Sequence, residues 1–508
     1  MDLVTVTWSS HNKIGPMDER SEATAETAAF DPHLRRRTHK SIFWTMGQAA
    51  GDQLFSFFVF VVLARLLDKE AIGTFALAFL FTDIGRAFCA AGVDQRVARL
   101  KYLDHRDLDT IFWTNMILAA AYSAVMIAAG PAAERIFHMP QLGECLRWLS
   151  VGVVLSGAGN THMALRLREF GHKTLAVRSV IGGLISGVVA VVAALLGAGI
   201  WALVLQRIVR ELVFTALTWA SVRWRPGIAF DHRSAGAYFR SWVDLGLAQV
   251  VNKLSLRVTD LGIARVLGAV PLSSYRVAWR CAELIGPQIV GPFATVALQT
   301  FSRLEHEKSE LKAAYVSILQ QSSLLSFPAL VGYAAAGPWI VPALFGPQWH
   351  DAGMVAPMLL PLALPFAITP FVLMLLAANG RITWQRRLAI LDLVTTTVVT
   401  WFAVPYGLRV LALAYSVRAL LLLPLQIFLT RRISGIGLRD HVRALAAPTA
   451  ASASMGLAVA ILFNAYNPSS PLTIILLCGA AALIYAAIVA VILPQYRRGL
   501  RHLVAAIV

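Results

Sequence analysis

Runs of about twenty apolar residues recur along the chain from residue 41 onward, and they constrain the fold more than any other feature. A helix of that length spans the roughly 30 Å hydrocarbon layer of a bilayer. The composition agrees, since 57% of the 508 residues are hydrophobic and 14% are charged. Soluble domains carry roughly 25% charged residues. The sequence therefore predicts an all-α polytopic membrane protein.

The apolar runs predict about fourteen transmembrane helices. They cover residues 42–66, 71–93, 111–131, 145–160, 176–196, 201–221, 241–266, 271–298, 313–335, 353–378, 388–406, 410–430, 444–465 and 471–493.

Basic residues give this set of helices an orientation. Every second connection contains Lys or Arg, whereas the opposite connections carry only Lys69, Arg135 and Arg409. Cytoplasmic loops of membrane proteins are enriched in these residues. We therefore expect both termini to be cytoplasmic and the number of spans to be even.

Residues 52–85 and 252–285 resemble two copies of one hairpin, offset by 200 positions without a gap. Ala64 recurs as Ala264, Arg65 recurs as Arg265, and Asp83 corresponds to Glu283. With six predicted spans per half, the copies open the first and seventh helices and have the same orientation in the membrane. Such repeats are related by an axis along the membrane normal in known transporters.

The repeat divides the chain into segments. Two six-helix bundles related by pseudo-two-fold symmetry, 41–222 and 241–432, are joined by a cytoplasmic linker, 223–240. Two extra helices follow at 443–493. Residues 1–40 are polar and predict a disordered cytoplasmic tail, and residues 494–508 predict a second cytoplasmic tail.

Ionisable residues concentrate on the second hairpin. Lys253, Arg257 and Asp260 are spaced by four and three residues, and so are Arg276, Arg280 and Glu283. This spacing places each set on one helix face, near the middle of the membrane at 1.5 Å per residue. The first half has fewer such charges on its hairpin, principally Asp52 and Asp83.

These charges admit two interpretations. They form ion pairs that join helices, or they line a hydrophilic cavity. Four cations against two carboxylates on this hairpin favour an anionic ligand, and arginine suits bidentate phosphate contacts. We predict a substrate-binding cationic cavity of Lys253, Arg257, Arg276 and Arg280. We assign Asp260, Glu283, Asp83 and Asp52 to ion coupling or ion pairing.

Other features are less specific. Pro357, Pro361, Pro365 and Pro370 favour kinks in one predicted helix, which is either permanently bent or a hinge for alternating access. The net charge of +17 is explained by basic cytoplasmic loops, and no nucleic-acid module is present. Cys89, Cys145, Cys281 and Cys478 have no metal-binding or redox spacing, and no cofactor is indicated.

Several motifs resemble the bacterial polysaccharide transport family of the multidrug, oligosaccharidyl-lipid and polysaccharide exporter superfamily. They are the stretch from Gln48 to Phe81, the segment Leu108–Asn115 (LDTIFWTN), and the segment Leu344–Trp349 (LFGPQW). The resemblance spans nearly the whole chain from residue 41.

That resemblance implies a flippase in the bacterial inner membrane. Such a protein moves undecaprenyl-diphosphate-linked oligosaccharide from the inner to the outer leaflet by alternating access, with coupling to a H⁺ or Na⁺ gradient. The expected partners are membrane lipids and the polysaccharide polymerase and glycosyltransferase machinery.

Three alternatives remain at this point. A lipid II flippase shares the fold and chemistry, whereas a cation-coupled multidrug exporter favours carboxylates over arginines. A membrane-embedded glycosyltransferase or polymerase needs a large outside loop, and the longest predicted one, 336–352, has only Asp351 as a charge. We therefore do not expect an enzyme.

Overall fold

The computed structural model describes residues 51, 53–99, 104–169, 172–468 and 470–492. Over these residues the chain is helical and contains no strand. Ten of the described helical segments are long and apolar enough to cross a membrane. The prediction of an all-α polytopic membrane protein is confirmed.

The helices fall into two sequential sets. The first set, which we call the first half, consists of Gln53–Leu66, α3 (Lys69–Ala90), α4 (Val93–Arg99), α5 (His105–Phe137), α6 (Leu142–Arg168), α7 (His172–Leu195) and α8 (Ile200–Ser221). The second half begins after the connection at 222–231. It consists of α9 (His232–Val266), α10 (Ala269–Arg303), α11 (Lys308–Phe345), α12 (His350–Val355), α13 (Ala363–Ala378), α14 (Ile382–Ala403), α15 (Leu408–Leu421), α16 (Leu423–Ser434), α17 (Leu438–Tyr466) and α18 (Pro471–Ile492).

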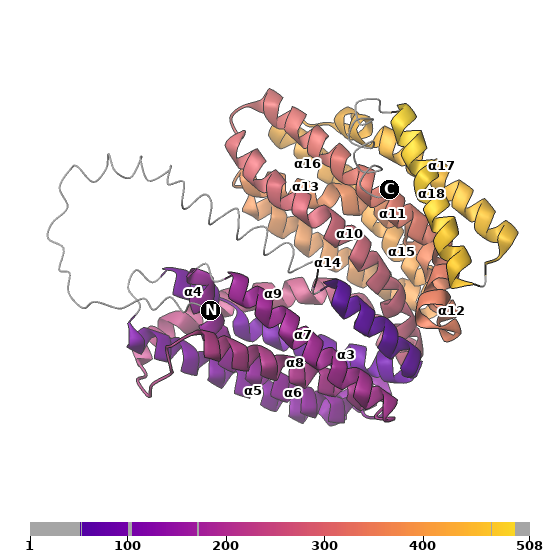
Figure 1. Cartoon of the computed structure of the whole chain (residues 1–508). Helices are drawn as coiled ribbons and strands as arrows, with labels where there is room; N and C mark the ends of the chain where they lie inside the picture. The colour runs from indigo at the N-terminus through magenta and orange to yellow at the C-terminus, as the bar shows by residue number, and fades with distance from the viewer. Residues whose placement is uncertain (1–50, 52, 100–103, 170–171, 469, 493–508) are drawn as a thin grey trace, which may run out of the picture.

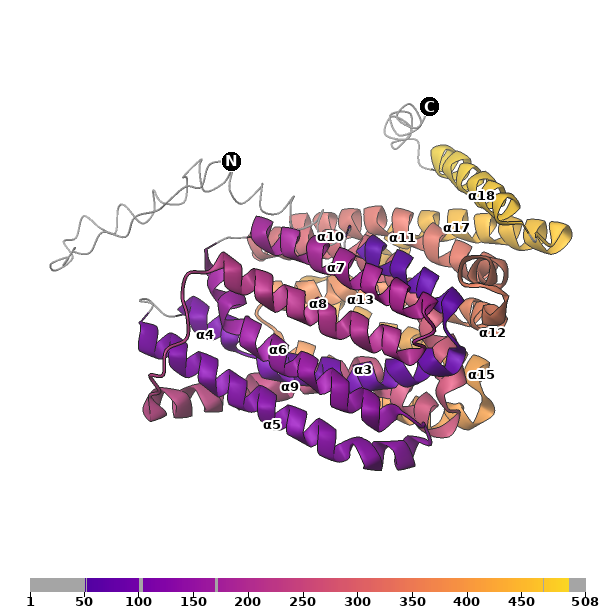
Figure 2. The same ribbon diagram turned by 60° about the horizontal axis from the view of Figure 1, so that its bottom comes forward.

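The two halves form adjacent groups of long helices (Figure 1). Within the first group the helices run side by side along a common direction (Figure 2). α3 packs against both α9 and α10, so it forms much of the junction between the halves. α17 and α18 lie at the outer edge of the second group.

The two repeated hairpins meet at their turns. A Cβ built on Gly73, near the start of α3, would lie 1.9 Å from the carbonyl oxygen of Ala269 at the start of α10. Only glycine permits that approach of one backbone to another. The junction between the halves therefore depends on the absence of a side chain at residue 73.

A second contact joins the halves near the same turns. Trp349 is fully buried, and its indole donates a hydrogen bond to the carbonyl oxygen of Ala64 at 2.8 Å. Arg65 donates from Nε to the carbonyl oxygen of Leu344 at 2.7 Å and from its guanidinium to that of Ala343. Arg65 is thus bound to the backbone of the second half as well as lying at a helix end.

The structure refines two predictions for 336–378, a loop at 336–352 that could hold a partial helix and a span at 353–378, which lies within the candidate span Pro347–Ala378. α11 continues through Pro338 and Pro342 to Phe345, so most of the predicted loop 336–352 is helical. The predicted helix 353–378 is divided into α12, a 3₁₀ segment at Ala356–Leu362, and α13. Pro357 and Pro361 lie in the 3₁₀ segment, and Pro365 and Pro370 lie in α13. Each proline removes a backbone donor, which explains the departure from regular α-helix.

The boundary of the predicted linker also changes, and some predicted segments lie outside the described residues. α9 begins at His232, so the second part of the predicted linker 223–240 is helical. Asp52 and the predicted tails 1–40 and 494–508 lie outside the described residues.

Candidate functional site

A cavity of about 240 Å³ lies between the two halves. The first half contributes residues of Gln53–Leu66, α3 and α8, and the second half contributes residues of α9 and α10. The polar lining residues are Ser56, Gln206, Arg207, Arg210, Arg257, Arg276 and Arg280. Of the described residues that line this cavity, five are arginines and none is a carboxylate. We call it the arginine cavity.

In the second half, two carboxylates hold three of these arginines. Asp260 lies 3.3 Å from Arg257 and 3.6 Å from Arg276. Glu283 lies 3.8 Å from Arg276 and 3.7 Å from Arg280. Neither carboxylate is among the residues that line the cavity, so both bind the guanidinium groups without forming part of the lining.

Arg280 also reaches across the junction between the halves. One of its terminal nitrogens donates a hydrogen bond to Ser56 Oγ at 3.0 Å. Ser56 lies on the first described helix, Gln53–Leu66. This hydrogen bond joins the polar linings that the two halves contribute.

In the first half, one carboxylate supports the arginines. Glu211 is 3% exposed, and its Oε1 lies 2.9 Å from Arg207 and 3.2 Å from Arg86. Arg207 lies 4.7 Å from the ring centre of Phe79, so its guanidinium also makes a cation–π interaction. Arg210 lies on the same helix, three residues after Arg207.

Lys253 has a different environment. Its Nζ lies 2.8 Å from Asp83 Oδ2, and Lys253 does not appear among the residues lining the arginine cavity. Asp83 belongs to α3 and Lys253 to α9, so this pair is a salt bridge between the halves. The structure thus brings Arg257, Arg276 and Arg280 together and places Lys253 beside Asp83.

The charges around the arginine cavity do not balance. Arg86, Arg207, Arg257, Arg276 and Arg280 form ion pairs with three described carboxylates, Glu211, Asp260 and Glu283, and Arg210 also lines the cavity. A buried cation in excess is costly unless water or an anion compensates it. Guanidinium groups donate in a planar fork that matches phosphate oxygens. The arrangement therefore suits a phosphate-bearing ligand.

Arg207 and Arg210 were not assigned to the cavity by sequence. Their spacing places both on one face of α8, but only tertiary packing brings that face towards α10. The available signal was their position inside an apolar span, together with Glu211.

A second cavity, of about 540 Å³, is apolar. It is lined by residues of α10, α11, α17 and α18 and by Phe57 of the first described helix. Ser56 and Phe57 are consecutive, so the arginine cavity and this apolar cavity both border that helix.

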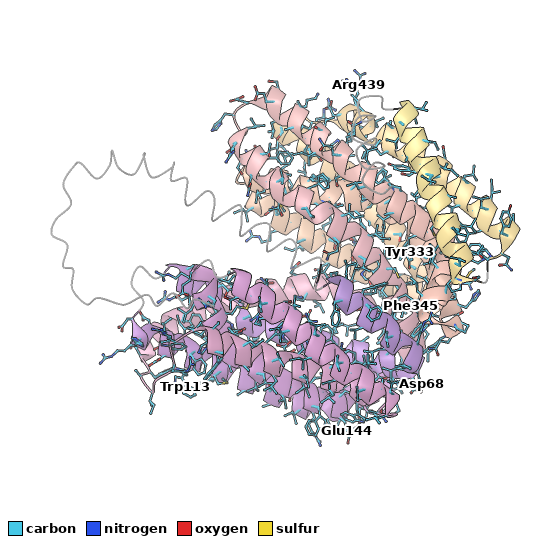
Figure 3. All side chains as sticks on the ribbon, in the orientation of Figure 1. Asp68, Trp113, Glu144, Tyr333, Phe345 and Arg439 are labelled. Carbon is cyan, nitrogen blue, oxygen red and sulfur yellow. The ribbon has the colours of Figure 1, made fainter. Side chains whose placement is uncertain are left out.

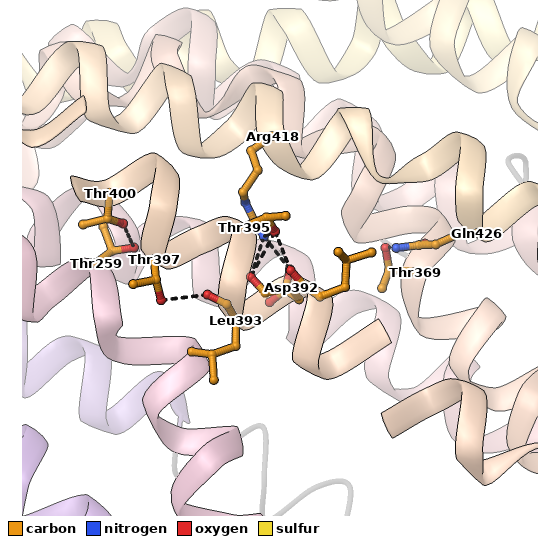
Figure 4. Close-up of polar contacts among 10 residues, drawn as sticks. Thr259, Thr369, Asp392, Leu393, Thr395, Thr397, Thr400, Arg418 and Gln426 are labelled. Carbon is orange, nitrogen blue, oxygen red and sulfur yellow. Dashed lines mark hydrogen bonds and ion pairs between the residues drawn. The ribbon is translucent and has the colours of Figure 1, made fainter. Parts of the chain in front are cut away.

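A further polar cluster lies within the second half (Figure 4). Arg418, buried on α15, contacts Asp392 Oδ1 at 2.7 Å and Thr395 Oγ1 at 3.1 Å. Thr259 of α9 and Thr400 of α14 share a hydrogen bond of 3.2 Å. These contacts join α9, α14 and α15 apart from the arginine cavity.

The connection between the halves, residues 222–231, is bound to the first half near Trp113. Asp68 and Trp113 lie at opposite ends of the first half, and Phe345 lies near the junction with the second (Figure 3). Trp113 donates to the carbonyl oxygen of Gly227, while Asp109 accepts from the Gly227 amide. These bonds fix the connection 222–231 to the first half. No group of three or more potential metal ligands occurs among the described residues.

The sequence matches a known protein family and several of its relatives. A family described as "Polysaccharide biosynthesis protein" matches residues 62–356. The chain is 24% identical to the succinoglycan biosynthesis transport protein ExoT of Rhizobium meliloti, over 62% of this chain and 63% of that protein. It is 23% identical to the lipopolysaccharide biosynthesis protein WzxC of Escherichia coli, over 57% of this chain and 59% of that protein. The chain thus spans about 60% of the length of these relatives.

Solved structures show the same fold. The lipid II flippase MurJ in an inward closed conformation is similar with a TM-score of 0.72 at 11% identity, over 90% of this chain and 99% of that one. An inward-facing MATE family multidrug transporter is similar with a TM-score of 0.61 at 17% identity, over 76% of this chain and 95% of that one. At this level of identity the likeness concerns the fold alone.

Proposed function

The chain belongs to the polysaccharide biosynthesis protein family, as its sequence motifs indicated, and we propose that it is a flippase for undecaprenyl-diphosphate-linked oligosaccharide repeat units. The proposed setting is the bacterial inner membrane, during exopolysaccharide or O-antigen synthesis. The relatives ExoT and WzxC are described as proteins of succinoglycan transport and lipopolysaccharide biosynthesis. No covalent bond changes in this process, so the protein acts as a transporter and not as an enzyme.

The arginine cavity is the observation that carries this proposal. Five arginines from both halves line one cavity at the junction. A diphosphate brings negative charge and several acceptor oxygens, which offset the cost of keeping guanidinium groups away from bulk water. The polyprenyl tail stays in the lipid while the diphosphate and sugars enter the cavity from the cytoplasmic side.

We propose alternating access as the mechanism, with the halves as the moving units. The fourteen predicted spans, the pseudo-two-fold relation of the halves and the cytoplasmic termini belong to this proposal. The 3₁₀ segment at Ala356–Leu362 contains Pro357 and Pro361 and supports a hinge there, since such segments inside helices mark bends; Pro365 of the same proposed hinge lies in the first turn of α13. The polymerase and glycosyltransferases are the expected functional partners.

Coupling to a H⁺ or Na⁺ gradient completes the proposed cycle. Asp260 and Glu283 are bound by arginines in this structure, and a diphosphate competes for the same guanidinium groups. A carboxylate released in this way becomes available to a cation or proton. Asp83, which pairs with Lys253, is the corresponding candidate at the junction.

Two alternatives use the same fold. A lipid II flippase differs in the sugars it recognises, and the likeness to MurJ is consistent with it. A cation-coupled multidrug exporter, suggested by the MATE likeness, is less favoured because no carboxylate lines the arginine cavity among the described residues.

Gene deletion in the source bacterium tests the function. We expect lipid-linked repeat units to accumulate in the inner leaflet and polymer export to stop. Arg257→Gln/Arg280→Gln should reproduce that defect. Arg265→Gln/Arg303→Gln removes the same charge from exposed positions of the same two helices and should export normally. Full export by the Arg257→Gln/Arg280→Gln variant would refute the arginine-cavity proposal.

A further inference from the structure

The first half contributes to the arginine cavity as directly as the second. Arg207 and Arg210 of α8 line it together with Arg257, Arg276 and Arg280 of α9 and α10. Phe75 and Phe79 of α3 line the same cavity. The cationic lining is therefore divided between the units that move relative to each other during transport.

Arg207 has hydrogen-bonding capacity left for a ligand. One terminal nitrogen lies 2.9 Å from Glu211, whereas its Nε is buried and has no hydrogen-bond partner. A guanidinium has five N–H donors, so one contact with Glu211 leaves most of them available.

Neighbouring groups fix the positions of both arginines. Glu211 and the ring of Phe79 hold Arg207, and Arg210 lies 5.1 Å from the ring centre of Phe214. Glu211 is 3% exposed and does not line the cavity, so it acts as a positioning residue. Side chains that are held in place lose little conformational entropy when an anion binds.

We propose, on the basis of the proposed function, that the diphosphate is bound at two poles, one on each half. Arg207 and Arg210 form the first pole, and Arg257, Arg276 and Arg280 form the second. One phosphate group contacts each pole, so the ligand offsets the repulsion between the arginines of the two halves. Binding of the diphosphate thereby favours the closed arrangement in which the poles face one another.

Inorganic pyrophosphate and orthophosphate provide the test on the purified full-length protein in detergent. A ligand that joins two poles binds more tightly than its separate parts, and we expect pyrophosphate to bind about tenfold more tightly than orthophosphate. Dissociation constants come from the ligand-dependent rise in melting temperature. Arg207→Gln/Arg210→Gln should reduce the preference for pyrophosphate to about threefold or less, a change of about half a decade or more in the ratio of affinities.

A matched control comes from the same cluster. Arg86 contacts Glu211 at 3.2 Å but does not line the cavity. Arg86→Gln should keep the preference of the wild-type protein, although it also removes one cation near Glu211. Loss of the preference in Arg86→Gln as well would show a general charge effect and overturn the two-pole proposal. Melting temperatures without ligand verify that each variant is folded, and Arg207→Lys provides a second variant that retains the charge.

The outcomes separate this proposal from the proposed function. If Arg207→Gln/Arg210→Gln keeps the preference while Arg257→Gln/Arg280→Gln loses it, the second half binds the anion alone and the two-pole proposal is wrong. If the wild-type protein has no preference for pyrophosphate, the two-pole proposal also fails. If neither pair affects any anion binding, the arginine cavity itself is not the substrate site and the proposed function loses its support.

Discussion

The two halves present arginines to the same cavity but neutralise them differently. In the first half, the carboxylate of Glu211 contacts Arg86 and Arg207. In the second half, Asp260 and Glu283 share Arg257, Arg276 and Arg280. The Glu211 side chain is 4% exposed and that of Glu283 is 27% exposed. The first cluster therefore depends on one buried group, whereas the second distributes its charge over two.

This difference predicts unequal costs when a carboxylate is neutralised. Glu211→Gln leaves two arginines without their buried partner and should lower the free energy of unfolding by about 3–5 kcal/mol. Glu283→Gln leaves Arg276 with Asp260 and keeps a more hydrated site, so we expect about 1–2 kcal/mol. Unfolding titrations in detergent measure both. Equal losses of unfolding free energy in the two variants would contradict the proposed difference between the two arginine clusters.

A second prediction concerns the contact between the two hairpins, which joins the two halves. Gly73→Ala places a methyl group against the backbone of Ala269 and should cost about 1–3 kcal/mol, because the two helices must separate. Gly291→Ala is the matched control on α10, where a Cβ has open space. That change should be neutral or should stabilise by about 0.5–1 kcal/mol. A Gly73→Ala protein as stable as the control would show that the turns do not hold the halves together.

The salt bridge between Lys253 and Asp83 should have a smaller effect. The pair links α9 to α3 and is partly exposed, with side-chain exposures of 31% and 20%. We expect a coupling free energy of about 1 kcal/mol in a double-mutant cycle of Lys253→Ala and Asp83→Ala. If the effects of the two single substitutions on the free energy of unfolding are additive, the salt bridge does not stabilise the contact between the halves.

Local spacing predicted three residues of the second half that line the arginine cavity. Arg257, Arg276 and Arg280 stood out because ionisable residues at helical intervals inside an apolar run are unusual. The spacing did not reveal that Lys253 pairs with Asp83, or that Arg207 and Arg210 face the same cavity. Those facts depend on how α3, α8, α9 and α10 pack, and the helical period of one segment contains no information about its neighbours.

The proline-rich region shows a similar limit. Pro357 and Pro361 predicted a bend, and the structure has a 3₁₀ segment there. Pro338 and Pro342 lie in the predicted outside loop 336–352, yet α11 runs through both. In a helix packed within a membrane protein, neighbouring groups tolerate the lost backbone bond, so proline alone does not determine where a helix ends.

Translocation by the purified protein in liposomes tests the central claim most directly. Vesicles contain a lipid-linked oligosaccharide diphosphate, and an enzyme added outside reports the fraction that crosses to the outer leaflet. We predict that Arg257→Gln/Arg280→Gln lowers the rate by about tenfold or more, the loss expected for removing buried charge-assisted contacts. Arg265→Gln/Arg303→Gln should remain within about twofold of the wild-type rate, as expected of exposed positions. Equal rates for the two double variants would contradict the assignment of the arginine cavity as the diphosphate site.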